Sequence, residues 1–216
     1  MSVAPAAVTG EAADWRRLRR DELPVATVAL GQFLIGKLLV RRFPDGVVAG
    51  RIVETEAYPP GDAAMHAYRG MTPRTRPLFL AHGHAYVYLC YGVSMMLNVV
   101  SEPVGVGAAV LVRAVEPIAG VALLMERRGT TRALDLARGP GRLAQAFGID
   151  KRFDGMDLCH NDTLYLATDG APPPMIAESV RIGITKDADR VWRYFVRDSR
   201  FVSGSGRLNG WMARKR

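Results

Sequence analysis

The 216-residue sequence contains few of the residues that build disulfide frameworks or metal sites. There are two cysteines, Cys90 and Cys159, and four histidines. Two cysteines cannot form a disulfide framework, and their spacing from the histidines matches no metal-binding motif. This composition is typical of a protein of the reducing cytosol. We therefore expect a cytoplasmic protein that binds no metal.

Long hydrophobic runs and cofactor motifs are also missing. The two most apolar stretches, 28–40 and 86–100, are interrupted by polar residues, so neither reads as a membrane span. The N-terminus lacks the basic and apolar segments of a secretory signal. We find no phosphate-binding loop, dinucleotide fingerprint or nucleophile elbow. These absences predict chemistry that depends on the protein's own side chains, without an organic cofactor.

Lysine is scarce as well, and the positive charge of the chain is carried almost entirely by arginine. Only four of the 29 basic residues are lysines, and the formal net charge is +8. A basic domain of this size is a candidate for binding nucleic acid. Arginine suits phosphate contacts and stacking on bases, but its excess over lysine is explained equally well by genome composition. Only the net charge therefore indicates a nucleic-acid partner.

The pattern of apolar residues and turns predicts one compact α+β domain at 15–208. A flexible tail at 1–14 precedes this domain, and a basic tail at 209–216 follows it. Hairpins with flanking helices favour α+β over a doubly wound sheet. The expected helices lie at 24–34, 118–128 and 140–147. The expected strands lie at 37–43, 47–58, 84–91, 95–101, 107–115, 163–167, 179–185 and 193–196.

The connection at 59–83 is unusually long for a compact domain and is dense in proline, glycine and arginine. Long connections of this kind tend to be functional. His66 lies within it, but a lone histidine is more often structural than catalytic.

Two carboxylates share one face of the strand expected at 47–58. Side chains alternate along a strand, so Glu54, Glu56 and Tyr58 point the same way. At least one carboxylate should meet solvent, an arginine or a reaction centre. The pattern alone favours a solvated strand face or a salt bridge from Glu54 to an arginine.

Three tyrosines lie close together in the expected hairpin at 84–101. Tyr86 and Tyr88 share a strand face, and Tyr91 stands beside Gly92 where it can project from the hairpin tip. Tyrosines in strands are commonly half-buried packing residues. In a basic protein they also suit base stacking or insertion into a groove.

Two polar residues interrupt apolar strands. Asn98 is the only amide in its run, and Arg113 is a charge within 110–115. If they are buried, each needs a partner. Glu116 is close enough in sequence to form a simple salt bridge with Arg113.

Taken together, these segments resemble the alkyladenine (3-methyladenine) DNA glycosylase family. The resemblance runs in order from about residue 23 to residue 203 and covers most of the chain. It is carried by RIVETEAY (51–58), DAAMH (62–66), TPRTR (72–76), YVYLCYG (86–92), LNV (97–99), VLVRAVEP (110–117), GPGRL (139–143) and RYF (193–195).

The resemblance implies roles that spacing alone does not. The family's general base falls on Glu56, and its intercalating residue falls on Tyr91. Glu54 is then expected to orient an arginine. Asn98 matches the residue that crowds the exocyclic amine of normal guanine. The family's damaged-base pocket falls on Tyr58, His66, Tyr88, Asn98 and Arg113.

The resemblance also implies a fold and a reaction. The fold would be a curved antiparallel sheet flanked by helices, with a protruding hairpin. The reaction would be that of a monofunctional DNA glycosylase in base excision repair, acting as a monomer on double-stranded DNA that contains alkylated or deaminated purines. It would flip the damaged base and hydrolyse its N-glycosidic bond with water activated by Glu56. Association with the nucleoid would follow from DNA binding.

Two other functions are compatible with the residues. One is a catalytically silent protein that binds lesions, and the other is an unrelated small-molecule enzyme that uses the face of Glu54 and Glu56. A lyase step is disfavoured because the matched pocket segments contain no lysine to act as an amine nucleophile.

Overall fold

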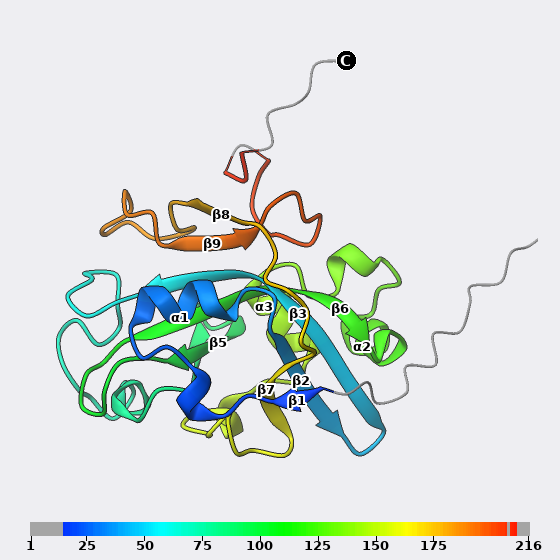
Figure 1. Cartoon of the computed structure of the whole chain (residues 1–216), viewed down its shortest axis with the longest axis horizontal. Coiled ribbons are helices and arrows are strands. Elements are labelled where there is room, and N and C mark those ends of the chain that lie inside the picture. The colour runs from blue at the N-terminus through cyan, green and yellow to red at the C-terminus, as the bar shows by residue number, and fades with distance from the viewer. Residues whose placement is uncertain (1–14, 207, 211–216) are drawn as a thin grey trace, which may run out of the picture.

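The computed structural model describes residues 15–206 and 208–210. Within them, nine strands form one open antiparallel sheet, accompanied by three α-helices (Figure 1). The predicted α+β domain with an antiparallel sheet is thus confirmed. The tail expected at 1–14 and most of the basic tail expected at 209–216 lie outside the described residues. None of the described helices is both long and apolar enough to span a bilayer.

Most of the predicted elements form near their expected positions. The α-helices are α1 (Thr27–Leu34), α2 (Val121–Arg128) and α3 (Pro140–Ala146). The strands are β1 (Arg16–Arg17), β2 (Leu38–Phe43), β3 (Gly46–Tyr58), β4 (Ala85–Cys90), β5 (Ser94–Val100), β6 (Ala109–Ala119), β7 (Leu164–Thr168), β8 (Ile176–Ser179) and β9 (Arg193–Val196). Short 3-10 helices lie in the connections: η1 (Arg20–Glu22), η2 (Arg76–Phe79), η3 (Ala133–Asp135) and η4 (Lys151–Phe153).

The long strand β3 organises the sheet, whose order is β1-β7-β2-β3-β6-β5-β4. One edge of β3 pairs with β6 along most of its length. Its other edge pairs first with β2 and then, at 54–56, with β9. Because β3 is paired on both edges where it carries Glu54 and Glu56, its backbone is fixed there by two sets of ladder hydrogen bonds.

The pairing of β3 with β6 is irregular at the position that matters most for the site. Ile52 is opposite Val115 and Thr55 is opposite Val112, with register shifts on both sides of Glu54. Shifts of this kind bend a strand and change the direction of its side chains. Arg113 lies within this irregular segment of β6, next to the two carboxylates of β3.

The main core is formed by the sheet together with α1 and α3. Leu30 and Leu34 of α1 are fully buried, as are Leu143 of α3 and Phe147 just beyond it. A smaller apolar cluster attaches the long connection 59–84 to the hairpin of β4 and β5; its buried members are Met65, Ala67, Leu78, Tyr86, Val100 and Ala109. Burial of these apolar side chains holds an otherwise irregular connection against the sheet.

The prediction of a strand at 179–185 is wrong. β8 ends at Ser179, and residues 180–185 form an irregular segment. Alternating Val180, Ile182 and Ile184 imitate a strand, but the Ile182 amide donates to the Glu56 carboxylate instead of a neighbouring strand. Gly183 has a φ of +78°, which is incompatible with an extended strand.

The boundary between the strand expected at 107–115 and the helix expected at 118–128 is also shifted. β6 continues to Ala119, and α2 begins only at Val121. Gly120 separates them with a φ of +64°, a left-handed conformation that glycine adopts readily. The apolar residues at 118–119 therefore extend the strand rather than begin the helix.

Gly50 provides a test of how closely β3 and β6 approach each other. A Cβ atom at this position would lie 2.5 Å from Val115 Cγ2. We expect Gly50→Ala to lower the free energy of unfolding by about 1–3 kcal/mol, because the packed core must shift to admit the methyl group. Urea unfolding measures this change. Val47→Ala, at an exposed position of the same strand, is the control, and equal stability of the two variants would contradict the close approach.

Candidate active site

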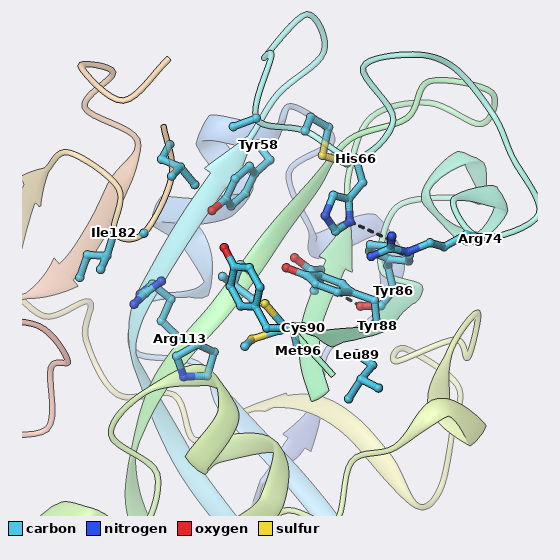
Figure 2. Close-up of a pocket in the computed structure, with 18 residues that line it drawn as sticks. Tyr58, His66, Arg74, Tyr86, Tyr88, Leu89, Cys90, Met96, Arg113 and Ile182 are labelled. Carbon is cyan, nitrogen blue, oxygen red and sulfur yellow. Dashed lines mark hydrogen bonds between the residues drawn. The ribbon is translucent and has the colours of Figure 1, made fainter. Parts of the chain in front are cut away.

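A cavity of about 600 Å³ opens where the end of β3 meets the hairpin of β4 and β5 (Figure 2). The connection 59–84 and the segment 180–185 complete its walls. A cavity of this size is within the range of small-molecule sites. Six of the seven predicted site residues line it: Tyr58, His66, Tyr88, Tyr91, Asn98 and Arg113. The seventh, Glu56, lies behind the wall and is fully buried.

Three aromatic rings form one side of the cavity. Tyr86 and Tyr88 are stacked, with ring centroids 5.4 Å apart, as expected for side chains on one strand face. The His66 ring meets Tyr88 edge-on at 4.5 Å, and His66 Nδ1 is 2.9 Å from the Tyr86 hydroxyl. This hydrogen bond fixes the orientation of the imidazole. The long connection thus supplies a site residue whose role could not be decided from the sequence.

Charge and burial keep these aromatic groups neutral. Burial lowers the pKa of His66, and the nearby Arg74 guanidinium lowers it further. Burial raises the pKa of Tyr86 to about 12 and that of Tyr88 also well above its ordinary value. The rings therefore present a neutral surface to the cavity near pH 7.

Three residues that line the cavity contact the Glu56 carboxylate, two through hydrogen bonds and one through an ion pair. Its Oε2 accepts from the Tyr58 hydroxyl at 2.9 Å and lies 3.1 Å from Arg113 Nη1. Its Oε1 accepts from the Ile182 amide at 2.7 Å. Burial and the charge of Glu56 raise the pKa of Tyr58, so its hydroxyl remains protonated and able to donate. The carboxylate is thus held directly behind the cavity wall.

Glu54 is buried as completely as Glu56 and binds two arginines. Its Oε1 accepts from Arg113 Nε at 2.8 Å and from Arg193 Nε at 2.7 Å. Ser203 donates to it through both its amide and its hydroxyl. The prediction of a solvated strand face is therefore wrong, and the predicted salt bridge from Glu54 to an arginine is confirmed. Arg113 has Glu54 and Glu56 as partners, not Glu116.

These four charged groups form a balanced buried cluster of two carboxylates and two guanidiniums. Burial alone would raise the pKa of Glu54, but Arg113 and Arg193 outweigh it, so the pKa lies below its ordinary value. Burial likewise opposes the charge of Arg113, and Glu56 and Glu54 outweigh it. Each charge is stabilised by its neighbours rather than by water.

Asn98 and Tyr91 lie in very different surroundings. Asn98 is buried, and its Nδ2 donates to the Tyr86 carbonyl at 3.1 Å. Tyr91 stands in the turn between β4 and β5 with 91% of its surface exposed. A large aromatic side chain that is exposed to this degree contributes little to the core, so packing does not explain its presence.

Sequence reasoning missed several residues that shape the site. Arg181 is buried in an ion pair with Asp62, which joins the segment 180–185 to the connection 59–84. Its guanidinium also lies over the Tyr58 ring, 4.5 Å from the centroid. Arg193 entered the sequence analysis only as part of the segment RYF (193–195), which carries the family resemblance, and no role was predicted for it. The one available signal for Arg193 was its place in a run of aromatic and apolar residues at 191–196, and that pattern equally suits a strand edge.

Comparison with known proteins decides which of the possible functions applies. Residues 21–200 match the family described as methylpurine-DNA glycosylase. The chain belongs to the methylpurine-DNA glycosylase family. It is therefore a DNA-repair enzyme that acts on DNA and hydrolyses N-glycosyl bonds. Membership confirms the resemblance and disfavours both the silent lesion-binding protein and the unrelated small-molecule enzyme.

The sequence similarity to individual relatives extends over nearly the whole domain. A protein of Mesorhizobium japonicum is 60% identical over 187 residues, covering 87% of this chain and 90% of the relative. One of Paraburkholderia phytofirmans is 47% identical over 191 residues, covering 88% and 90%. A third, of Methanoculleus marisnigri, is 46% identical over 181 residues, covering 82% and 93%. All three carry names that assign them as 3-methyladenine DNA glycosylases.

The charge cluster can be tested by removing one of its carboxylates. Glu54→Gln leaves two buried guanidiniums facing only one carboxylate, so we expect the free energy of unfolding to fall by about 3–5 kcal/mol. Denaturant unfolding at pH 7 measures this loss. Glu178→Gln, the same change at an exposed position of β8, should be close to neutral.

The pH dependence of the same variant gives a second readout. The folded-state pKa of Glu54 is depressed, so its contribution is fully present above the unfolded pKa, which is about 4.5, and is lost as the pH falls through the folded value. The difference in stability between the wild type and Glu54→Gln should therefore shrink below about pH 4.5. A constant difference from pH 7 to pH 3 would contradict the depressed pKa.

Proposed function

We propose that this glycosylase flips an alkylated or deaminated purine out of double-stranded DNA into the cavity and hydrolyses its N-glycosidic bond with water activated by Glu56. The observation that carries the proposal is the placement of Glu56. Its carboxylate accepts hydrogen bonds from Tyr58 and Ile182 and forms an ion pair with Arg113. All three residues line a base-sized cavity. This links a potential general base to the point where a flipped nucleotide would enter.

The aromatic walls suit a purine taken out of the base stack. Extrusion from a duplex costs a few kcal/mol, which stacking inside the enzyme must offset. Tyr58 projects into the cavity from β3 and Tyr88 from β4 (Figure 2), and together they offer two ring surfaces. His66, oriented by Tyr86, offers a hydrogen bond to the base edge. Asn98 stands where it can crowd an exocyclic amine and so disfavour normal guanine.

The chemistry requires only a base and a water molecule when the leaving group is good. Alkylation at N3 or N7 gives the purine a positive charge and weakens the bond to C1′. A single carboxylate can then activate the water that attacks the oxocarbenium-like centre. Glu56 Oε2 already accepts a hydrogen bond from the Tyr58 hydroxyl and forms an ion pair with Arg113, whereas Oε1 accepts only from the Ile182 amide. We therefore assign the proton transfer to Oε1.

The complete burial of Glu56 sets one condition on this mechanism. Because its side chain has no exposed surface, a water can reach Oε1 only if part of the cavity wall moves. The segment 180–185 is the nearest irregular part of that wall, and it contributes Ile182, Gly183 and Ile184. Catalytic contacts often reach their working geometry only when substrate binds. DNA binding would then admit the water by shifting this segment.

Substitution of Glu56 tests its role as the general base. Glu56→Gln keeps the shape of the side chain but removes its basicity, so excision of a methylated purine or of hypoxanthine from duplex DNA should fall by about 10²–10⁴-fold. Single-turnover release of the free base measures the effect, and Glu178→Gln controls for the loss of one carboxylate. Excision near the wild-type rate would rule out Glu56 as the base.

Substitution of Tyr91 tests the role of the exposed hairpin tip. If Tyr91 fills the gap that the flipped base leaves, Tyr91→Ala should lower excision from duplex DNA by roughly tenfold or more, with less effect on DNA affinity at low salt. Val93→Ala, which changes another exposed residue of the same turn, is the matched control. Unchanged excision by Tyr91→Ala would remove the wedge role.

A further inference from the structure

Arg74 is a cavity residue whose one effect described above is to lower the pKa of His66. It belongs to the connection 59–84, lines the cavity and is exposed. Its Cζ atom lies 5.7 Å from the centroid of the Tyr88 ring. Figure 2 shows its side chain extending toward Tyr86 and His66. The guanidinium is therefore part of the surface that surrounds a bound base.

The charge of Arg74 is not offset by a carboxylate. The cluster of Glu54, Glu56, Arg113 and Arg193 is balanced, and Arg181 is paired with Asp62. Among the residues at 15–206 and 208–210, by contrast, no acidic side chain forms an ion pair with Arg74. The cavity thus carries one positive charge in excess.

Both tyrosines that would hold a purine already face a guanidinium. Arg181 lies over Tyr58, 4.5 Å from its centroid, and Arg74 approaches Tyr88. The attraction of an aromatic ring for a cation comes from the negative charge on its face. A ring that already interacts with one cation offers less to a second, and the two cations repel each other. A cationic base therefore gains less from these rings than it would without the two guanidiniums, whereas a neutral base loses no such attraction.

We propose that Arg74 is a specificity-determining residue that disfavours cationic purines relative to neutral ones in this cavity. The inference rests on the proposed function, since it concerns which damaged bases the same cavity accepts. Purine nucleotides methylated at N3 or N7 carry a positive charge on the base, whereas hypoxanthine and ethenoadenine are uncharged at neutral pH. The remaining contacts of the cavity are available to both kinds of base, so charge is the property on which Arg74 acts.

The proposal can be tested with one cationic and one neutral lesion in the same duplex sequence. Single-turnover excision of 7-methylguanine and of hypoxanthine gives a rate ratio for each variant. The shapes and intrinsic reactivities of the two bases are the same in every measurement, so they cancel when the ratios are compared. Arg74→Gln should raise the ratio of 7-methylguanine to hypoxanthine by about tenfold, the effect expected of one charge partly screened by solvent.

Two further variants separate charge at the cavity from other effects. Arg74→Lys keeps the positive charge and should retain a ratio near that of the wild type. Arg76→Gln removes an exposed charge two residues away that does not line the cavity, and it should also leave the ratio unchanged. If Arg76→Gln shifted the ratio as much as Arg74→Gln, the effect would be a general one of net charge and the proposal would be wrong.

The remaining outcomes are equally decisive. Equal loss of both activities in Arg74→Gln, with a weaker dependence of DNA binding on salt, would identify Arg74 as a phosphate contact and overturn the proposal. An unchanged ratio with unchanged rates would overturn it as well. If the wild-type protein released neither base, the proposed function itself would fail and the inference with it. Activity on both lesions with an unchanged ratio would overturn the inference alone.

Discussion

The site depends on the interaction of Glu54 with Arg113 and Arg193 inside the protein. Removing an ion from water costs several kcal/mol, and only well-placed partners offset that cost. Each of the four charged groups in the cluster has at least one such partner, and Ser203 supplies two further hydrogen bonds to Glu54. Glu54 therefore fixes Arg113, and Arg113 in turn fixes the carboxylate of Glu56 at the cavity wall. The long strand β3 makes this possible because it is paired on both edges at 54–56.

The residues of the site could be found from the sequence to the extent that their positions follow from local geometry. Strand alternation placed Glu56 and Tyr58 together, and the glycine beside Tyr91 indicated an exposed turn. The family resemblance was needed to separate Glu56 from Glu54, because both occupy the same face with the same side chain. The cavity itself could be predicted only as a consequence of that resemblance.

Other features could not be predicted because they depend on contacts distant in the sequence. The partner of Arg113 was open, since Glu116 is nearer in sequence than either carboxylate of β3, and only the irregular pairing of β3 with β6 decides between them. The segment 180–185 has the alternation of a strand, and nothing in that pattern indicates that the Ile182 amide binds Glu56. The role of Arg181 has the same cause, because its partner Asp62 is 119 positions away.

The contact between Glu54 and Ser203 joins residues 149 positions apart, and this separation affects how the enzyme matures during synthesis. Chains fold from the N-terminus as they leave the ribosome. When β3 emerges, neither Arg113 nor Arg193 has been made, and after Arg113 follows, the two carboxylates of β3 still lack half of the cationic charge that later balances them. The nascent sheet can form its apolar core early, but its acidic strand is neutralised only when the last part of the domain is released. A ribosome-bound chain that ends before residue 193 would therefore hold a nearly complete sheet around an unfinished charge cluster.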